Sequence, residues 1–399
     1  VLIVRLQSQR CDGMVEYAVC SKHSVCACLR IASSSNASIC IDQFLLSRSE
    51  LVQCKRPTNT CHEPEHLCAY HSRCHDFPIC YPVPSFNPEY CPLIMIPNIF
   101  ANATWSKNGV IVAGGNGKGN ATNQLNEPFG VFIDDDRIVL IADYLNHRIM
   151  QWKTGDMTNG HVVAGGKGQG NRLDQLNCPT DVLIEKETDS LIICDRWNRR
   201  VLRWSRRSDT TQGEIFMDNI DCWGLAMDDQ RYLYVSDIVK HEVKRYHLGD
   251  KDSTLVVGGN DQGNDLNQLK EPRYLFVDRQ QNVYVSDWSN HRVLKWNKDA
   301  KEGIIVAGGQ GVGNALTQLN HPSGLFVDML GTFYVGDEGN HRIVLWTQGA
   351  KQGTVIVGVN RAGPGVNQLS NPIGLSFDRQ GNLYVADYGN HRVQRFSLE

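Results

Sequence analysis

Five histidines recur in one short setting along the later part of the chain. Each follows an asparagine or a lysine, and four of them precede an arginine: His147, His241, His291, His341 and His391. Imidazole is a common metal ligand, so the set raises the question of a metal site. Ligands of one ion must converge on a point, whereas repeated positions spread around a ring. We therefore predict a structural role, in which the aspartate four residues before each histidine accepts hydrogen bonds and the arginine after it pairs with a carboxylate.

A second polar set stands just before the first apolar run of each repeat, at Glu127, Cys178, Asp221, Glu271, His321 and Asn371. Carboxylates are the ligands that Ca²⁺ prefers, so Glu127, Asp221 and Glu271 are candidate calcium ligands. They are also ordinary loop positions, and two of them directly precede a proline. We predict no cofactor. A metal-dependent lyase or hydrolase that uses these acids is the alternative function.

These residues belong to a unit that the chain repeats six times. Its copies are centred on Asp143, Asp195, Asp237, Asp287, Asp337 and Asp387, at intervals of 42 to 52 residues. In residues 320–358, four short apolar runs are bounded by Gly, Asn or Asp, which is typical of strands. Such a period predicts an array of four-stranded antiparallel sheets with little helix.

The landmarks of the unit resemble a known family. Pro322-Ser-Gly324 opens the first strand, Tyr334-Val-Gly-Asp337 closes the second, and Asn340-His-Arg-Ile343 enters the third. The pattern resembles NHL-repeat proteins over residues 98–399. The resemblance implies an all-β fold, a six-bladed β-propeller. Amidating lyases resemble this outline but place histidine ligands in the central channel. Here the predicted channel strands contain no histidine, and Asp181 alone puts a carboxylate in the usual glycine slot.

The ends of the array predict how the ring closes. Residues 109–114 match an outer strand, yet they precede the first unit, and the last unit ends without an outer strand. We expect residues 109–114 to complete the sixth blade, which removes a free sheet edge. Glycine-rich connectors follow most outer strands, but the third unit lacks one. Blades 2 and 3 are therefore where we expect a partner to approach.

Residues 1–97 are a different kind of sequence. Eleven of the 14 cysteines lie before Pro92, which predicts a disulfide-stapled head, possibly of two small modules, with a zinc module as the alternative. Sequons at Asn36, Asn102 and Asn120 agree with an oxidising compartment. Val1 to Val4 are interpreted as the tail of a removed signal peptide. We expect a secreted or cell-surface protein whose chain has no membrane span.

Three cysteines lie within the repeats. Cys178 and Cys222 begin neighbouring first strands, so we predict a disulfide between them. Cys194 takes the small-residue slot that Ala142, Ser286 and Ala386 hold elsewhere, which predicts a buried free thiol.

Aromatic residues and arginines are predicted to lie on the face that carries the connectors. The expected partner-binding residues are Phe129, Tyr144, Trp197, Trp223, Arg273, Tyr274, Trp288 and Tyr388. Aromatic residues and arginine dominate protein–protein hot spots, although the same residues could pack between blades. A basic patch comprises Arg196, Arg199, Arg200, Arg203, Arg206 and Arg207. It fits either a solvated strand edge or an anionic partner such as a sulfated glycan.

These observations predict an extracellular, non-enzymatic binding module that recognises a protein or glycan through its loop-rich face. RNA binding, which the resemblance to intracellular tripartite-motif NHL domains suggests, is a second alternative. Nucleic acid is an unlikely partner, because the net charge is −3 and the sequons and cysteines indicate another compartment.

Overall fold

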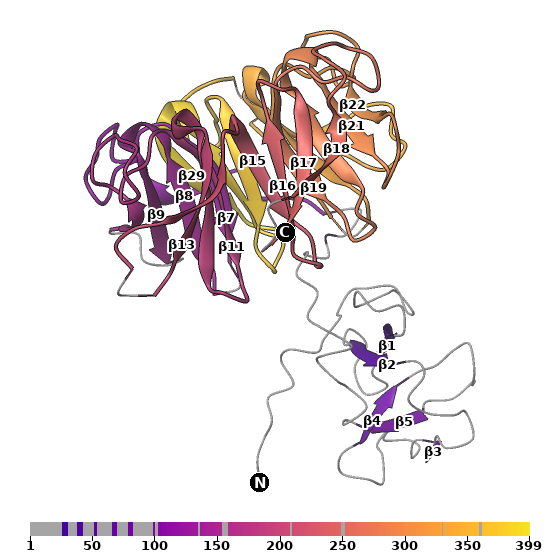
Figure 1. Cartoon of the computed structure of the whole chain (residues 1–399). Coiled ribbons are helices and arrows are strands. Elements are labelled where there is room, and N and C mark those ends of the chain that lie inside the picture. Colours follow the sequence, from indigo (N-terminus) through magenta and orange to yellow (C-terminus); the bar gives the residue numbers. More distant parts are fainter. Residues whose placement is uncertain are drawn as a thin grey trace, which may run out of the picture. The chain divides into compact units, whose positions relative to one another are not determined.

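The computed structural model describes residue 99 and residues 103–399, apart from residues 135, 154–158, 208–209, 249–251, 329 and 359–360, and the backbone of five short strands before residue 83. The chain divides into two compact units, Val1–Phe100 and Ala101–Glu399. Figure 1 colours the chain from indigo to yellow in sequence order. No helix in the described part is long and apolar enough to cross a bilayer.

In the first unit, the described strands form two small antiparallel sheets. One pairs β1 (Cys26–Arg30) with β2 (Ser38–Asp42). In the other, β5 (Ile79–Pro82) lies between β3 (Val52–Gln53) and β4 (His66–Ala69). The predicted disulfides of the head and the sequons at Asn36 and Asn102 lie outside the described side chains.

The second unit is a ring of six four-stranded antiparallel sheets, which confirms the all-β propeller prediction. Blade 1 comprises β7 (Pro128–Ile133), β8 (Ile138–Asp143), β9 (Arg148–Lys153) and β10 (His161–Gly165). Blade 2 comprises β11 (Pro179–Glu185), β12 (Ser190–Asp195), β13 (Arg200–Ser205) and β14 (Glu214–Asp218). Blade 3 comprises β15 (Cys222–Met227), β16 (Tyr232–Asp237), β17 (Glu242–His247) and β18 (Ser253–Gly258).

The last three blades follow the same plan. Blade 4 comprises β19 (Pro272–Val277), β20 (Val283–Asp287), β21 (Arg292–Trp296) and β22 (Ile304–Gly308). Blade 5 comprises β23 (Pro322–Val327), β24 (Phe333–Asp337), β25 (Arg342–Trp346) and β26 (Thr354–Val357). Blade 6 comprises β27 (Pro372–Phe377), β28 (Leu383–Asp387), β29 (Arg392–Phe396) and β6 (Val110–Gly114). The first strand of each blade contacts the first strand of the next, so these six strands line the axis.

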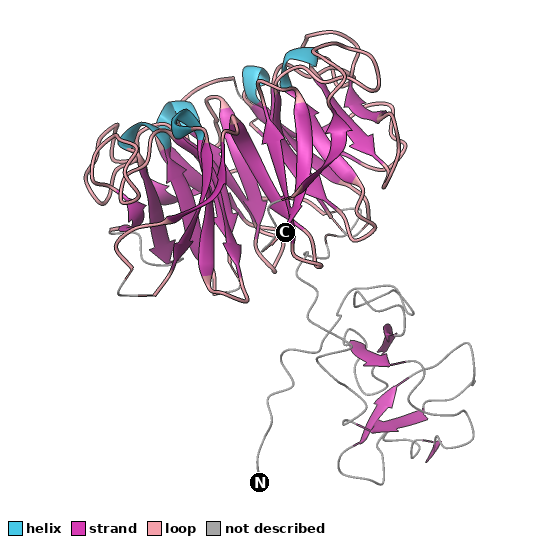
Figure 2. Ribbon diagram, in the orientation of Figure 1, coloured by secondary structure: helices cyan, strands magenta, loops and turns pink. Residues whose placement is uncertain are grey.

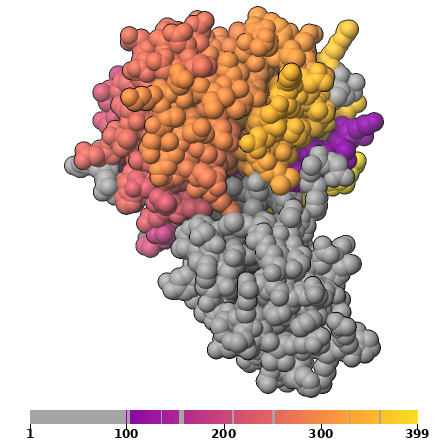
Figure 3. Space-filling view, turned by 90° about the vertical axis from the view of Figure 1, so that its right-hand side faces the viewer, coloured from indigo at the N-terminus to yellow at the C-terminus, as the bar shows by residue number. Residues whose placement is uncertain are grey.

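The ring closes as predicted. β6 pairs with β29 in antiparallel register, with Ala113 opposite Val393 and Gly114 opposite Arg392. Trp105 strengthens the junction, because its indole Nε1 donates to the carbonyl oxygen of Gly381 at 2.9 Å and its ring packs edge-on against Tyr334. Figure 3 shows the violet start of the propeller beside its yellow end. The two ends of the repeat array are therefore joined without a covalent link.

The core lies between the blades. Third-strand residues such as Trp152, Trp296, Trp346 and Phe396 are almost fully buried. Each hydrophobic cluster draws on neighbouring blades, as Val112 of β6 does with Val131 of β7. Burial of this apolar surface is the main contribution to stability, and it depends on every blade having two neighbours.

The loop-rich face carries the only helical turns in the described part of the chain. They are 3-10 turns at η2 (Tyr144–Asn146), η3 (Arg196–Asn198), η4 (Trp288–Asn290), η5 (Glu338–Asn340) and η6 (Tyr388–Asn390). Figure 2 shows them gathered in cyan at one end of the blades. Each directly follows the repeated aspartate, and four of the residues predicted to bind a partner lie in these turns: Tyr144, Trp197, Trp288 and Tyr388.

Candidate functional site: the mouth of the central channel

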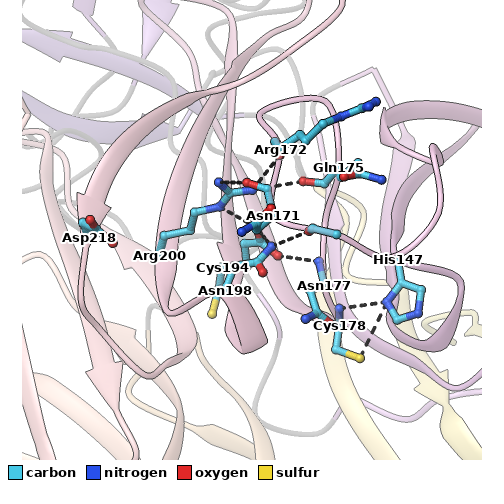
Figure 4. Close-up of polar contacts among 12 residues, drawn as sticks. His147, Asn171, Arg172, Gln175, Asn177, Cys178, Cys194, Asn198, Arg200 and Asp218 are labelled. Atoms are coloured by element: carbon cyan, nitrogen blue, oxygen red, sulfur yellow. Dashed lines mark hydrogen bonds and ion pairs between the residues drawn. The ribbon is translucent and has the colours of Figure 1, made fainter.

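The repeated aspartate and arginine hold the connector that enters their own blade (Figure 4). In blade 2, Oδ1 of buried Asp195 accepts a hydrogen bond from the backbone N–H of Asn177 at 2.7 Å. Its Oδ2 accepts one from Arg200 Nε at 2.7 Å and one from Asn198 Nδ2 at 2.8 Å. The remaining guanidinium nitrogens donate to the connector carbonyl oxygens of Asn171, Arg172 and Gln175.

Four other blades repeat this clamp. The pairs are Asp143–Arg148, Asp287–Arg292, Asp337–Arg342 and Asp387–Arg392. Burial raises the pKa of each of these aspartates, while the paired arginine opposes that shift. The predicted structural role of the motif is confirmed, since both side chains are engaged in holding backbone.

The histidines connect neighbouring blades. Each Nδ1 accepts a backbone N–H from the residue before the first strand of the next blade, at 3.0–3.2 Å: His147 from Cys178, His241 from Glu271, His291 from His321, His341 from Asn371, and His391 from Glu127. Burial lowers the pKa of His147, His291 and His391. The five rings serve five separate junctions, as the ring interpretation predicted.

Blade 3 departs from this pattern for a physical reason. Only residues 219–221 separate β14 from β15, so there is no long connector to hold. The clamp residues are accordingly absent: Lys240 replaces the asparagine and Glu242 replaces the arginine. Asp237 instead accepts the backbone N–H groups of Val239 and Lys240. Trp197 and Val239 are 59% and 58% exposed on this part of the face.

Six of the eight predicted partner-binding residues form one aromatic cluster at the channel mouth. Phe129 stacks on Tyr144 with ring centroids 4.2 Å apart, and it contacts Trp223 and Tyr388, each at 5.5 Å. Arg273 places its guanidinium 3.7 Å from the ring centroid of Trp288 and 4.3 Å from that of Trp223. Blades 1, 3, 4 and 6 thus meet across the axis.

The cluster has an exposed rim and a buried base. Trp197 is exposed, and its Nε1 donates to the hydroxyl oxygen of Tyr144 at 2.9 Å, which fixes the indole. Phe129, Trp223 and Tyr274 are over 90% buried. The structure therefore places Trp197 at the surface, whereas these three support the cluster from below.

Glu338 is a mouth residue that the sequence interpretation missed. Its Oε2 accepts hydrogen bonds from Arg273 at 2.9 Å and from Trp288 Nε1 at 3.0 Å. Burial raises the pKa of Glu338, and the charge of Arg273 opposes that shift. The sequence could have identified Glu338, because it directly follows the repeated aspartate. Tyr144, Trp288 and Tyr388 were predicted from that same position.

Below the mouth, Asp181 and Tyr274 fill the axis where four other blades have glycine. Asp181 is buried and accepts the backbone N–H groups of Val182 and Leu225, both at 2.9 Å. Burial raises its pKa to about 7. Tyr274 donates its hydroxyl to the carbonyl oxygen of Thr180 at 3.2 Å, across from blade 4 to blade 2. Gly130 shows why glycine is usual here, since an added Cβ would lie 2.4 Å from Asp181 Oδ1.

The predicted basic patch is not a set of free cations. Arg196 and Arg199 each lie 2.9 Å from a different carboxylate oxygen of Asp221. The clamp buries Arg200, and Arg203 pairs with Glu214 at 2.7 Å. Arg206 lies 3.0 Å from Asp189, while Arg207 is exposed. Because acids from other segments neutralise most of these charges, the patch offers little to an anionic partner.

The three candidate calcium ligands are held apart by different partners. Asp221 binds the two arginines above, Glu127 accepts the hydroxyl of Tyr388 at 2.9 Å, and Glu271 accepts that of Ser289 at 2.7 Å. No group of three or more His, Cys, Asp or Glu side chains suited to a metal occurs among the described residues. These residues do not fit the calcium site that the sequence suggested.

The predicted Cys178–Cys222 disulfide is wrong, and so is the predicted free thiol at Cys194. Cys194 of β12 bonds to Cys222 of β15, with Cα atoms 5.8 Å apart, and Cys178 is free. Both cysteines lie at the start of the first strand of their blade, where the side chain contacts the preceding blade. Cys178 Sγ lies 3.7 Å from His147 Nδ1 of blade 1, whereas Cys222 is bonded to Cys194 of blade 2. The two therefore never approach each other.

The fold and these clamps define a six-bladed propeller, and four of its blades carry the complete set of Asp, Asn, His and Arg. A family model described as "NHL repeat" matches residues 369–396, which contain β27, β28 and β29. The last blade therefore matches the NHL repeat, and the other five blades share its four-stranded antiparallel plan. No curated protein sequence matches it.

Solved structures share the fold at low sequence identity. A Bacteroides thetaiotaomicron structural genomics protein of unknown function superposes with a TM-score of 0.60 at 14% identity, covering 93% of this chain and 87% of that one. An auxiliary nutrient binding protein from the same organism gives 0.55 at 15% identity, covering 84% and 83%. A Bacteroides ovatus auxiliary nutrient binding protein gives 0.53 at 11% identity, covering 93% and 89%. At these identities the likeness extends to the fold alone.

Proposed function

We propose that this chain is an extracellular, non-enzymatic binding module that recognises a protein partner through the channel mouth. The observation that carries the proposal is Trp197, an indole that is 59% exposed yet fixed by its hydrogen bond to Tyr144. A rigid aromatic side chain loses little conformational entropy on binding, which is why such residues anchor interfaces.

The surroundings of Trp197 suit a protein more than a highly charged glycan. Arg196 lies over the indole at 5.3 Å from its centroid, but Arg196 and Arg199 share the carboxylate of Asp221, which leaves one net positive charge beside the indole. Exposed Val239 on the adjacent blade adds an apolar contact. The short connector between β14 and β15 leaves this area uncovered by the chain's own loops.

Extracellular placement is supported by the Cys194–Cys222 disulfide, because such bonds persist in oxidising compartments. The sequon at Asn120 lies on an exposed residue and is consistent with this placement. The auxiliary nutrient binding proteins described above have the same fold, so a propeller of this kind is compatible with a binding role.

The test is proximity labelling of intact cells with the full chain, comparing the wild type with Trp197→Ala. Leu330→Ala is the matched control, since Leu330 is 48% exposed in the loop between β23 and β24, away from the 3-10 turns. We expect Trp197→Ala to lose the labelled protein set and Leu330→Ala to keep it. Equal labelling by both variants would overturn the proposal, as would labelling that disappears when cell-surface glycans are enzymatically removed.

A further inference from the structure

We infer that Arg273 is a carboxylate-recognition site at the channel mouth, so that the ligand bound there presents a carboxylate on a partly apolar body. This inference rests on the proposed binding function and specifies the chemistry of the ligand.

The guanidinium of Arg273 is held in position by its neighbours before any ligand binds. The guanidinium lies close to two indole rings, with centroids at 3.7 Å for Trp288 and 4.3 Å for Trp223. Its Nη1 donates to Glu338 Oε2 at 2.9 Å. The side chain is 14% exposed, so the rings and the glutamate fix it in one orientation. Little conformational entropy remains to be lost when a ligand binds.

The other edge of the guanidinium is unused. Among the described residues, Nε and Nη2 of Arg273 have no hydrogen-bond acceptor, and neither atom is among the buried side-chain atoms that lack one. Both donors therefore reach solvent. Nε and Nη2 lie on the same edge of the planar group, and their two parallel N–H bonds match the two oxygens of a carboxylate.

A second donor without a partner belongs to one of the two indoles that contact the guanidinium. Trp223 is 8% exposed, and its indole Nε1 is buried without a hydrogen-bond partner. A buried N–H without an acceptor destabilises the free protein, and a ligand oxygen that reached it would remove that cost.

Charge and surroundings select the ligand class. Glu338 already balances the single positive charge of Arg273, so a bound anion adds net negative charge to the mouth, and a singly charged carboxylate adds less than a doubly charged phosphate. Tyr144 and Tyr388, which pack on the buried ring of Phe129, supply further aromatic contacts. A chain terminus, an acidic side chain or a sugar acid would meet this description.

The test uses small probes and the indole N–H signals of protein labelled with ¹⁵N-tryptophan, with Trp223 and Trp288 assigned through Trp→Phe variants. N-acetylglycine is compared with N-acetylglycinamide, and glucuronate with glucose. We expect saturable shifts of these two signals with the carboxylates, at a Kd on the order of 1–10 mM for fragments of this size. Neither neutral probe should produce them. A preference for N-acetylglycine indicates a peptide carboxylate, and a preference for glucuronate indicates a sugar acid.

Two variants separate recognition from a structural role. Arg273→Gln combined with Glu338→Gln removes the site without leaving a buried charge, and it should abolish the shifts. Glu338→Gln alone removes the competing carboxylate and should tighten carboxylate binding about tenfold. Arg203→Gln on the outer part of blade 2 is the matched control and should change nothing.

Equal shifts with charged and neutral probes, or unchanged affinity in Glu338→Gln, would overturn the inference. Its failure is distinguishable from failure of the proposed function. If Trp197→Ala loses the partner while the double variant of Arg273 and Glu338 keeps it, the result supports the proposed binding face and contradicts the carboxylate site.

Discussion

Replacing both Cys194 and Cys222 with alanine is expected to destabilise the propeller at the junction of blades 2 and 3. The two residues are separated by 28 positions in sequence. In the chain-entropy model, opening a loop of that length lowers the free energy of unfolding by about 3.5 kcal/mol. Both sites are completely buried, so the lost sulfur contacts add to this effect.

Urea unfolding followed by tryptophan fluorescence measures the change. The wild type should lose a comparable amount of stability when a reductant is added, whereas the double alanine variant should not respond. Cys178→Ala is the matched control, because Cys178 is also buried but forms no disulfide. It should keep the response to reductant. A wild type that ignores reductant, or peptide mapping that links Cys178 to Cys222, would refute the reasoning.

Three further predictions concern the histidine junctions between blades, the buried aspartate at the axis and the closure of the ring. Burial lowers the pKa of His391, so the unfolded chain binds a proton before the folded protein does as the pH falls below about 6.5. The free energy of unfolding should therefore decrease below that pH. His391→Asn keeps a hydrogen-bond acceptor that does not titrate, so its urea midpoint should decrease less between pH 7.5 and pH 5. Asp181 behaves in the opposite way, because its raised pKa of about 7 makes ionisation at higher pH unfavourable. Asp181→Asn should be about 2 kcal/mol more stable than the wild type at pH 8.5, once the loss of one backbone hydrogen bond is allowed for, and this advantage should vanish near pH 4. Trp105→Ala should lower the free energy of unfolding by about 3–5 kcal/mol in the same assay, and a loss below 1 kcal/mol would contradict its role in closing the ring.

The repeat pattern was enough to predict the fold, because each local signal agrees with the others. The strand lengths, the period and the misplaced outer strand at residues 109–114 all require one closed ring. The roles of Asp143 and Arg148 were equally accessible, since a buried acid three residues from the turn asparagine and five from the arginine can contact both. These contacts are local in sequence.

Contacts between blades were harder to predict. Asp221, the acid that pairs with Arg196, lies in the connector to blade 3, and a pattern of arginines does not reveal it. The Cys194–Cys222 pairing joins the second strand of one blade to the first strand of the next, so equivalent positions were the wrong guide. Aligning repeats identifies which residues correspond, but it does not show which neighbouring blade each side chain contacts.

The junction between blades 2 and 3 shows how one deletion accounts for several departures from the repeat. Without a long connector, the arginine of blade 3 has no carbonyl oxygens to bind, and Glu242 stands in its place. The histidine of blade 2 is replaced by Arg199, whose Nε binds Asp221 at 2.9 Å and whose carbonyl oxygen accepts the N–H of Ile220 at 3.0 Å. The disulfide to Cys222 joins the same two blades covalently. The lost backbone clamps are thus replaced by an ion pair and a covalent bond, which hold the blades together while leaving Trp197 and Val239 uncovered. This uncovered area is where the proposed function places the partner.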